Sequence, residues 1–284
     1  MTRRKQKKDR ASRPRRLGRL LMLLPFTAAL FYPVYLSTQL DVCREEFVSP
    51  ALPAAFDGLT VAFASDIHYG VFLDRDRVCR LARTLNGLKP DVLLLGGDYG
   101  EDADGAIRFW ELRPGFTAKL AMAGVLGNHD RMHPESNKEK IMEAMRENGV
   151  MPLCNDALLL QKDGQTLAIA GIDDYYNGAP DAEKTAALCQ GADFTLLLSH
   201  SPDALPDIQP PFYQLALCGH THGGQVRVFG RAIRSSSDYG SRYLFSWHEI
   251  NGAAVFVTNG VGTSTLPVRL GARPQVHLIT LKKK

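Results

Sequence analysis

The sequence predicts an α/β domain that follows an N-terminal segment of different character. Two observations predict this fold class. Short apolar runs recur along the body of the chain, and amphipathic helical patterns lie between some of them. These runs stop at glycine or at polar residues, as strands covered on both faces do. The composition agrees with a globular chain, since 45% of the 284 residues are apolar and 23% are charged.

The chain opens with a basic tail, predicted over residues 1–19 and expected to stay in the cytoplasm. Residues 1–20 hold ten Lys or Arg residues and one acidic residue, and the rest of the chain is mildly acidic. The excess positive charge therefore lies in the tail, and not on a surface of the body. For this reason no nucleic-acid partner is expected.

Leu20 to Leu40 carry no charge, and as a helix this run would span about 31 Å. We therefore expect residues 20–40 to be a transmembrane signal anchor, with Tyr32 and Tyr35 near its outer end. The basic side stays in the cytoplasm, which makes this a single-pass protein of the cell membrane with an extracytoplasmic catalytic domain. A cleaved signal peptide, which would leave an exported form, is the alternative.

Residues 41–56 contain two prolines and no clear period, and they predict a linker. The catalytic domain is expected over residues 57–284. It begins with a strand at Leu59–Ser65 and a helix at Arg75–Leu88, whose apolar residues recur at helical spacing. The next strand is the continuous apolar run Val92–Leu95, which stops at two glycines.

The rest of the body repeats these patterns. A helix is predicted over Lys138–Asn148, because Gly149 suits the residue after a helix end. A two-residue hairpin turn is predicted at Asp163–Gly164. Further strands are predicted at Ala121–Leu126, Ala157–Leu160, Leu167–Gly171, Thr195–Leu198, Leu215–Cys218, Ala253–Thr258 and Gln275–Leu281.

Polar side chains of metal-binding type follow five of these strands. They are Asp66 and His68, Asp98, Asn128 with His129 and Asp130, His200, and His220 with His222. Ligands of open α/β sheets bind at the carboxyl ends of strands, so we expect these residues to converge. A mixture of Asp, His and Asn suits divalent Mn, Fe, Zn or Co. About eight ligands are too many for one ion and predict two, which need a bridging carboxylate.

At these residues the chain resembles the calcineurin-like metallophosphoesterases. The shared motifs are DxH, GD, GNH(D/E), H and GHxH, and they stand here in that order. The resemblance covers about residues 57–284. Its C-terminal part, with GHTHGGQ and TNGVGTSTLPVRLG, resembles a membrane-associated bacterial subgroup of the family. The resemblance implies a four-layer α/β/β/α sandwich.

The resemblance also implies a role for each site residue. The implied ligands of the first metal are Asp66, His68, Asp98 and His222. Those of the second are Asp98, Asn128, His200 and His220, with Asp98 as the bridge. His129 is implied to bind the phosphoryl group or to protonate the leaving oxygen without being a ligand. We expect Asp130 to orient His129, because a general acid needs a partner that fixes its tautomer.

The expected activity is hydrolysis of phosphomonoesters or phosphodiesters by a hydroxide held between the two metals. We expect a phosphoester substrate, and an anchor in the membrane favours one that is linked to a lipid. A second hypothesis is a hydrolase of lipid precursors that resembles UDP-2,3-diacylglucosamine pyrophosphatase. A third is a non-catalytic, metal-bound scaffold. Outside the motifs, Arg269 fits a phosphate contact or a packing role, and Asp173 and Asp174 favour a turn.

Overall fold

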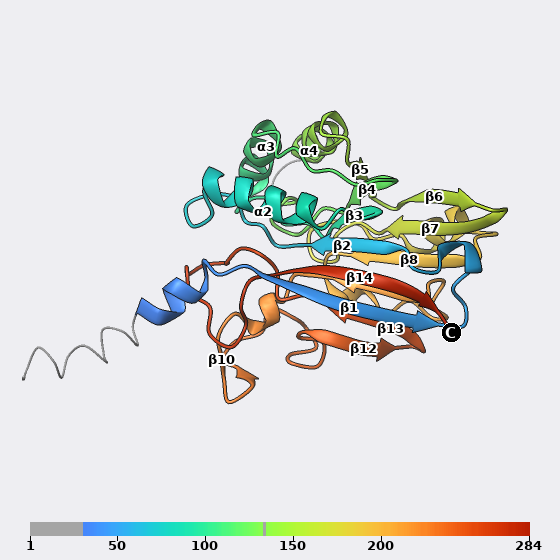
Figure 1. The fold of residues 1–284 in the computed structure, drawn as a ribbon. Coiled ribbons are helices and arrows are strands. Elements are labelled where there is room, and N and C mark those ends of the chain that lie inside the picture. Colours follow the sequence, from blue (N-terminus) through green and yellow to red (C-terminus); the bar gives the residue numbers. More distant parts are fainter. Residues whose placement is uncertain (1–30, 133–134) are drawn as a thin grey trace, which may run out of the picture.

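Two six-stranded sheets pack face to face in the computed structural model, which describes residues 31–132 and 135–284. Three helices, α2, α3 and α4, cover the outer face of the first sheet (Figure 1). The outer face of the second sheet is covered by the short helix α5 and by loops. The predicted α/β class is confirmed. The layer outside the second sheet, which the α/β/β/α expectation assigns to helices, contains little helix.

The first sheet has the order β1 (Asp41–Ser49), β14 (Gln275–Lys283), β2 (Thr60–Ala64), β3 (Val92–Leu95), β4 (Ala121–Gly124) and β5 (Met151–Pro152). The second has the order β12 (Ser246–Ile250), β13 (Ala253–Val257), β9 (Leu215–Cys218), β8 (Phe194–Ser199), β7 (Gln165–Gly171) and β6 (Asp156–Lys162). The α-helices are α2 (Arg75–Gly87), α3 (Ala103–Glu111), α4 (Glu135–Glu147) and α5 (Ala182–Leu188). The short elements are η1 (Ala54–Phe56), η2 (Pro202–Ala204), η3 (His222–Gly224), β10 (Arg227–Val228) and β11 (Arg231–Ala232).

Alternating side chains of the central strands fill two different cores. In β2, Val61 and Phe63 pack in the core between the two sheets, whereas Ala62 and Ala64 pack under the helices. In β8, Leu196 and Leu198 face the first sheet and Leu197 faces the outer layer. Each large apolar side chain buried in this way contributes about 1.5–3 kcal/mol. A one-residue slip of any such strand would exchange its two faces.

The direction of the strands brings the predicted site residues to one end of the molecule. Strands β2 to β5 run parallel to one another, as do β7, β8, β9 and β13. Their carboxyl ends lie at the end of the molecule where Figure 1 draws the 31–36 helix and β10. The β6–β7 hairpin extends from the opposite end, and its turn residues Asp163 and Gly164 both have positive φ, as predicted for a two-residue turn.

Helix α3 has no counterpart among the predicted elements. It begins after Asp102, whose side chain accepts from the backbone N–H of Gly105 at 2.7 Å. Its buried face holds Ala106, Phe109 and Trp110. With nine residues, it is too short for its apolar period to stand out in the sequence, and its first turn is acidic and contains glycine.

The structure differs from the expectation of a linker at residues 41–56. Residues 41–49 form the edge strand β1, which pairs in parallel with β14 from Asp41 opposite Gln275 onward. After it, Leu52 and Phe56 are buried in the core between the sheets. The strand escapes sequence analysis because its residues are alternately exposed and half-buried, and because its partner lies at the far end of the chain. Its charged residues also protect the sheet edge from pairing with another chain.

Most of the predicted N-terminal anchor lies outside the described residues, as does the whole basic tail (1–19). Of the run 20–40, the structure describes residues 31–40, of which 31–36 are helical. The end of this run belongs to the body: Leu36 and Ser37 are buried, and Arg77 Nη2 donates to the carbonyl of Ser37 at 2.6 Å. Within the described ranges, no helix combines the length and the apolar character that crossing a membrane requires.

We predict that a chain beginning at Asp57 is markedly less stable than one beginning at Gln39, which keeps β1. The shorter chain loses Leu52 and Phe56 from the core, which costs at least about 3 kcal/mol. It also exposes the edge of β14 to other molecules. Thermal unfolding followed by circular dichroism, together with sedimentation, measures both effects. Equal midpoints for two monomeric proteins would show that β1 is dispensable.

Candidate metal centre

The polar residues that follow the strands of both sheets converge at their carboxyl ends. Three groups of side chains each present metal-binding atoms that lie within 4.8 Å of one another. The groups are Asp66 with His68 and His222, His68 with Asp98 and His129, and Asp66 with Asp98 and His200. The structure thus brings together residues that the sequence places in separate motifs.

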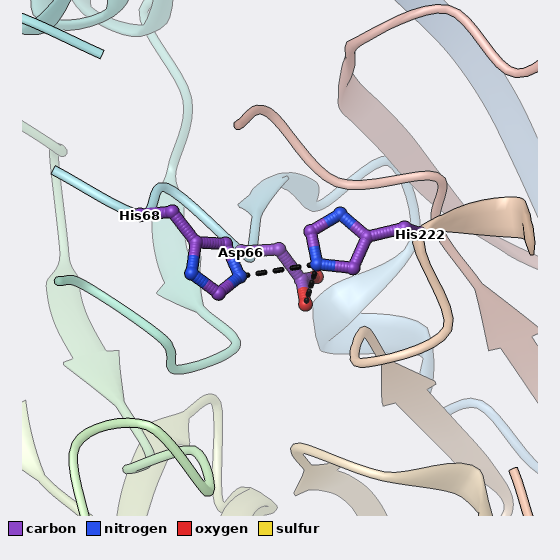
Figure 2. Close-up of side chains that lie close together, drawn as sticks. All are labelled: Asp66, His68 and His222. Carbon is purple, nitrogen blue, oxygen red and sulfur yellow. Dashed lines mark hydrogen bonds and ion pairs between the residues drawn. The ribbon is translucent and has the colours of Figure 1, made fainter. Parts of the chain in front are cut away.

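The first half of the centre combines residues that follow β2 and β9. Figure 2 shows Asp66, His68 and His222 pointing toward one another. Nε2 of His68 lies 3.0 Å from Nε2 of His222, which in turn lies 3.7 Å from Oδ1 of Asp66. All three side chains are buried. Three donor atoms from two sheets therefore surround one small volume.

The second half of the centre is formed by four residues from four strand ends. Nε2 of His200 lies 3.2 Å from Oδ2 of Asp98 and 3.2 Å from Oδ1 of Asn128. The same oxygen of Asn128 lies 2.9 Å from Nδ1 of His220. Nδ1 of His200 donates to the carbonyl of Gly96 at 2.7 Å, which aims its other nitrogen at the centre.

Asp98 lies between the two halves. Its Oδ2 is 3.5 Å from Nε2 of His68, on the first side, and 3.2 Å from Nε2 of His200, on the second. Its Oδ1 accepts from the backbone N–H of His129 at 2.9 Å. One carboxylate oxygen thus faces both groups of nitrogen donors, as a bridging ligand must.

The donor set fits divalent cations. Burial lowers the pKa of His68 to about 3 and that of His220 to about 4, so both imidazoles are neutral at neutral pH and carry a lone pair. Oδ2 of Asp66 is buried and has no hydrogen-bond partner among the described residues. Buried polar atoms are normally satisfied. A cation between Asp66, His68 and His222 would supply the partner that the protein does not.

His200 and Asp98 form a charged pair at the centre. Burial opposes the charged form of His200, but the carboxylate of Asp98 raises the pKa of His200 well above its usual value. In the same way, burial opposes ionisation of Asp98, and His200 lowers the pKa of Asp98 well below its usual value. The negative carboxylate is therefore the stable form, as cation binding requires, and a bound cation would displace the proton from Nε2 of His200.

Many of the converging residues have a left-handed backbone. The φ angles of five of them lie between 50° and 68°, namely Asp66, His68, Asp98, His220 and His222. This conformation is uncommon for residues other than glycine, and it clusters at functional sites. The surrounding hydrogen bonds hold it: Asp66 donates its backbone N–H to Gly97 at 2.9 Å, and His68 donates to Asp98 at 3.0 Å.

Two glycines allow the loops to approach the side chains of the centre. A Cβ atom on Gly127 would collide with Asp98 and His200. A Cβ atom on Gly219 would collide with the side chain of Asp66. Glycine is therefore required at both positions because a Cβ atom would not fit, and not because the backbone needs a conformation that only glycine adopts.

Asp130 does not orient His129, contrary to the expectation from the sequence. Nδ1 of His129 instead bonds to the carbonyl of Glu101 at 2.7 Å. The carboxylate of Asp130 accepts three backbone N–H groups, from Asp98 at 2.8 Å, Tyr99 at 2.9 Å and Gly127 at 2.9 Å. Asp130 therefore joins the loops after β3 and β4, and the carbonyl of Glu101 takes the role that we expected of it.

Arg269, for which the sequence left a phosphate contact or a packing role open, supports His222 of the centre. Its guanidinium is fully buried, donates to the carbonyl of His222 at 2.7 Å and lies 3.0 Å from Nδ1 of the same histidine. Burial lowers its pKa to about 9. The sequence carries no signal for this role, because Arg269 stands alone among apolar residues and its contact is far away along the chain.

Tyr176 supports the second half of the centre. Its ring stacks on His220 with 4.8 Å between the ring centroids, and its hydroxyl donates to the buried carboxylate of Asp203. The turn that carries Tyr176 is held by Asp174, which accepts from the backbone of Tyr176 and Asn177, in agreement with the turn role expected for it. Asn177 in turn donates to the carbonyl of Asn128 at 2.8 Å.

A groove of about 360 Å³ opens beside the centre. Its polar wall contains Asp98, Asn128, His129, His220 and His222. The rest of its lining comes from segments later in the chain, which contribute the apolar residues Ile233, Leu266 and Val268 beside polar ones such as Arg234 and Ser264. His129 also packs edge-on against His68, with ring centroids 4.7 Å apart, so it lies between the groove and the first group of donors.

The network of Asp130 leads to a specific prediction for Asp130→Asn. An amide oxygen can take over the bonds to Asp98 and Gly127, but the amide NH2 would then face the N–H of Tyr99. We expect a loss of about 3 kcal/mol in stability, because one bond is lost and the buried N–H of Tyr99 is left without an acceptor. Metal content should fall with stability.

The change in rate should be independent of the leaving group of the substrate, since Asp130 does not touch His129. Denaturant unfolding and the rates on two esters with different leaving groups measure this. If the rate falls only on esters with poor leaving groups, Asp130 does orient His129.

Comparison with known proteins places these residues in a known context. Residues 59–224 match the sequence profile of the family described as Calcineurin-like phosphoesterase, and this range includes every predicted site residue. The chain is 29% identical over 258 residues to the metallophosphoesterase YkuE of Bacillus subtilis, with 88% of this chain and 89% of YkuE covered.

Two further relatives extend the comparison. The phosphodiesterase YaeI of Escherichia coli is 29% identical, with 78% of this chain and 81% of YaeI covered. A zebrafish (Danio rerio) protein, called transmembrane protein with metallophosphoesterase domain, is 27% identical, with 93% of this chain and 62% of the relative covered. The matched range and these relatives identify a metal-dependent hydrolase, and the chain belongs to the calcineurin-like phosphoesterase family.

Proposed function

We propose that the protein hydrolyses phosphomonoester or phosphodiester bonds with two divalent cations. The observation that carries this proposal is the place of Asp98, whose Oδ2 faces His68 at 3.5 Å and His200 at 3.2 Å. A carboxylate between two groups of nitrogen and oxygen donors is what two neighbouring cations need. The relative named a phosphodiesterase supports the ester class.

The proposed ligands follow from the two halves of the centre. Asp66, His68, Asp98 and His222 would hold one cation, and Asp98, Asn128, His200 and His220 would hold the other. Neutral imidazoles and carboxylates suit Mn, Fe, Zn or Co. When bound, the cations supply Lewis acidity toward a phosphoryl oxygen and make water a stronger nucleophile.

His129 is the proposed catalytic acid. It lines the groove next to the metal-binding residues, and its Nδ1 is held by the carbonyl of Glu101. Its other ring nitrogen is then the one that can give a proton to a departing oxygen. The backbone N–H of His129 bonds to Asp98, so the acid and the bridging carboxylate keep a constant separation.

We also propose that the uncharged run predicted over residues 20–40 anchors the protein in the cell membrane as a single pass, with the catalytic domain outside the cytoplasm. The uncharged run and the basic tail before it support this orientation. The zebrafish relative described as a transmembrane protein supports an anchored arrangement. A substrate that is carried by a lipid would suit an enzyme held at the bilayer.

Asp98→Asn should abolish turnover and reduce the metal content from two ions per chain to fewer than one. The amide keeps the bond to His129 but loses the charge that offsets two cations. Metal analysis by mass spectrometry and the rate on a chromogenic phosphodiester measure both effects. Asp91→Asn is the matched control, because Asp91 lies at the other end of β3 and also accepts a backbone N–H bond. Normal turnover in Asp98→Asn with two bound metals would refute the bridge.

His129→Ala should keep both metals and slow the reaction by about 10²–10⁴-fold, the usual contribution of a general acid. The loss should be larger for an alkyl ester than for a p-nitrophenyl ester, whose leaving group needs little protonation. His248→Ala serves as the control, since the side chain of His248 bonds to the carbonyl of Phe245 and is not among the described residues that line the groove. If the metal content falls in His129→Ala, His129 is a metal ligand and not a general acid alone.

A further inference from the structure

We propose that the β10–β11 hairpin and the loop 264–268 form a rim that contacts an anionic lipid bilayer. This rim is defined by Phe229, Arg231, Ile233, Arg234 and Leu266, of which Ile233, Arg234 and Leu266 line the groove. The proposal rests on the anchor in the proposed function and goes beyond it. It gives the catalytic body its own membrane contact and directs the site toward phosphoesters at the lipid surface.

The turn of the hairpin carries an aromatic residue that the fold does not use. Arg227 pairs with Ala232 and Val228 with Arg231, so Phe229 and Gly230 form the turn. Phe229 has a φ of 51° and is fully exposed. Asn and Gly are the residues that such a turn favours, and a bulky residue at positive φ is strained there. The aromatic ring is therefore available to a partner outside the described protein.

The apolar surface continues from the hairpin to the opening of the groove. Ile233 is 72% exposed and Leu266 is 58% exposed, and both line the groove that contains His129 and His222. Single exposed apolar residues are ordinary on protein surfaces. Here they come from two separate segments and line the same metal-binding groove. An apolar partner at this surface would lie directly beside the site.

The rim is held in place by contacts at the base of the hairpin. Arg227 donates its backbone N–H to Leu270 and its Nε to the carbonyl of Gly271, each at 2.7 Å. Its guanidinium also lies over the ring of Phe245, 3.8 Å from the centroid. These contacts tie the base of the hairpin to the segment that follows the loop 264–268.

The N-terminal run enters the body next to this rim. The backbone N–H of Arg269 donates to the carbonyl of Pro33 at 2.9 Å, which joins the loop after Leu266 to the 31–36 helix. Phe31, Tyr32 and Tyr35 of this helix are exposed. Figure 1 draws the helix and β10 at the same end of the molecule. Aromatic residues of this kind are enriched where a helix leaves a bilayer.

The end of the uncharged run joins the body directly. Leu36 and Ser37 are buried, and the carbonyl of Pro33 accepts the backbone N–H of Arg269. The proposed anchor lies before this junction, so it would hold the end of the body that carries the groove nearest to the bilayer.

The charge of the rim selects the kind of surface. Arg231 and Arg234 are exposed, and neither forms an ion pair within the described parts of the chain. Each basic residue close to an anionic membrane contributes about 1 kcal/mol. Apolar side chains flanked by arginines match a bilayer with anionic headgroups, where a purely apolar protein partner would leave both charges unpaired.

The test uses the full chain in vesicles of three parts phosphatidylcholine to one part phosphatidylglycerol, with acyl chains brominated in a matched set. The variant F229W places an indole at the turn, and L159W is the control, because Leu159 is 46% exposed on β6 at the opposite end of the molecule. Brominated lipid should quench the added fluorescence of F229W by about half, since interfacial side chains reach the headgroup–acyl boundary. The added fluorescence of L159W should be unaffected. Omitting phosphatidylglycerol should weaken the quenching of F229W.

Three results would overturn the rim, and each has its own signature. If the chain floats with the vesicles but F229W is not quenched, the rim is wrong and the anchor stands. If F229W and L159W are quenched alike, the body has no preferred membrane face. If the chain does not float, both the rim and the anchor are wrong. Hydrolysis of bis(p-nitrophenyl) phosphate in the same samples reports separately on the phosphoesterase proposal.

Discussion

The contact between Asp98 and His200 makes one site out of two sheets. Asp98 follows β3 of the first sheet, His200 follows β8 of the second, and their side chains meet at 3.2 Å. This distance depends on how closely the sheets pack, and that packing is set by side chains such as Phe63 and Leu196 in the core between them. The core therefore contributes to the proposed chemistry by holding candidate ligands from the two sheets close enough to share a cation.

The same convergence imposes strain, which the surrounding network has to offset. Five donor residues adopt a left-handed backbone, and each such residue costs on the order of 1 kcal/mol or more. The buried carboxylate of Asp130 opposes this cost by binding three backbone N–H groups of the two loops that carry Asp98 and His129. A rigid scaffold of this kind keeps donors in place before any ligand arrives, which lowers the reorganisation needed during reaction.

The chemistry and its surroundings come from different parts of the chain. Every donor lies within residues 59–224, the range that matches the family. The apolar lining residues of the groove, the β10–β11 hairpin and Arg269 all come from later segments. The donors can thus stay constant while the later segments change what reaches them. This division is what a fold shared by enzymes of different substrates requires.

The sequence by itself determined most of the strand pattern, the hairpin turn at Asp163–Gly164 and the candidate donor residues that follow the strands. These are local properties, because strand period, turn chemistry and donor type are all readable within a few residues. Only the tertiary structure decided that residues 41–49 form a strand, that Asp130 binds loop backbone instead of His129, and that Arg269 supports His222. Each of these depends on a partner that is distant in the chain or on the direction of a side chain. A distant partner and the direction of a side chain leave no periodic signal in the sequence, because only folding brings the partners together.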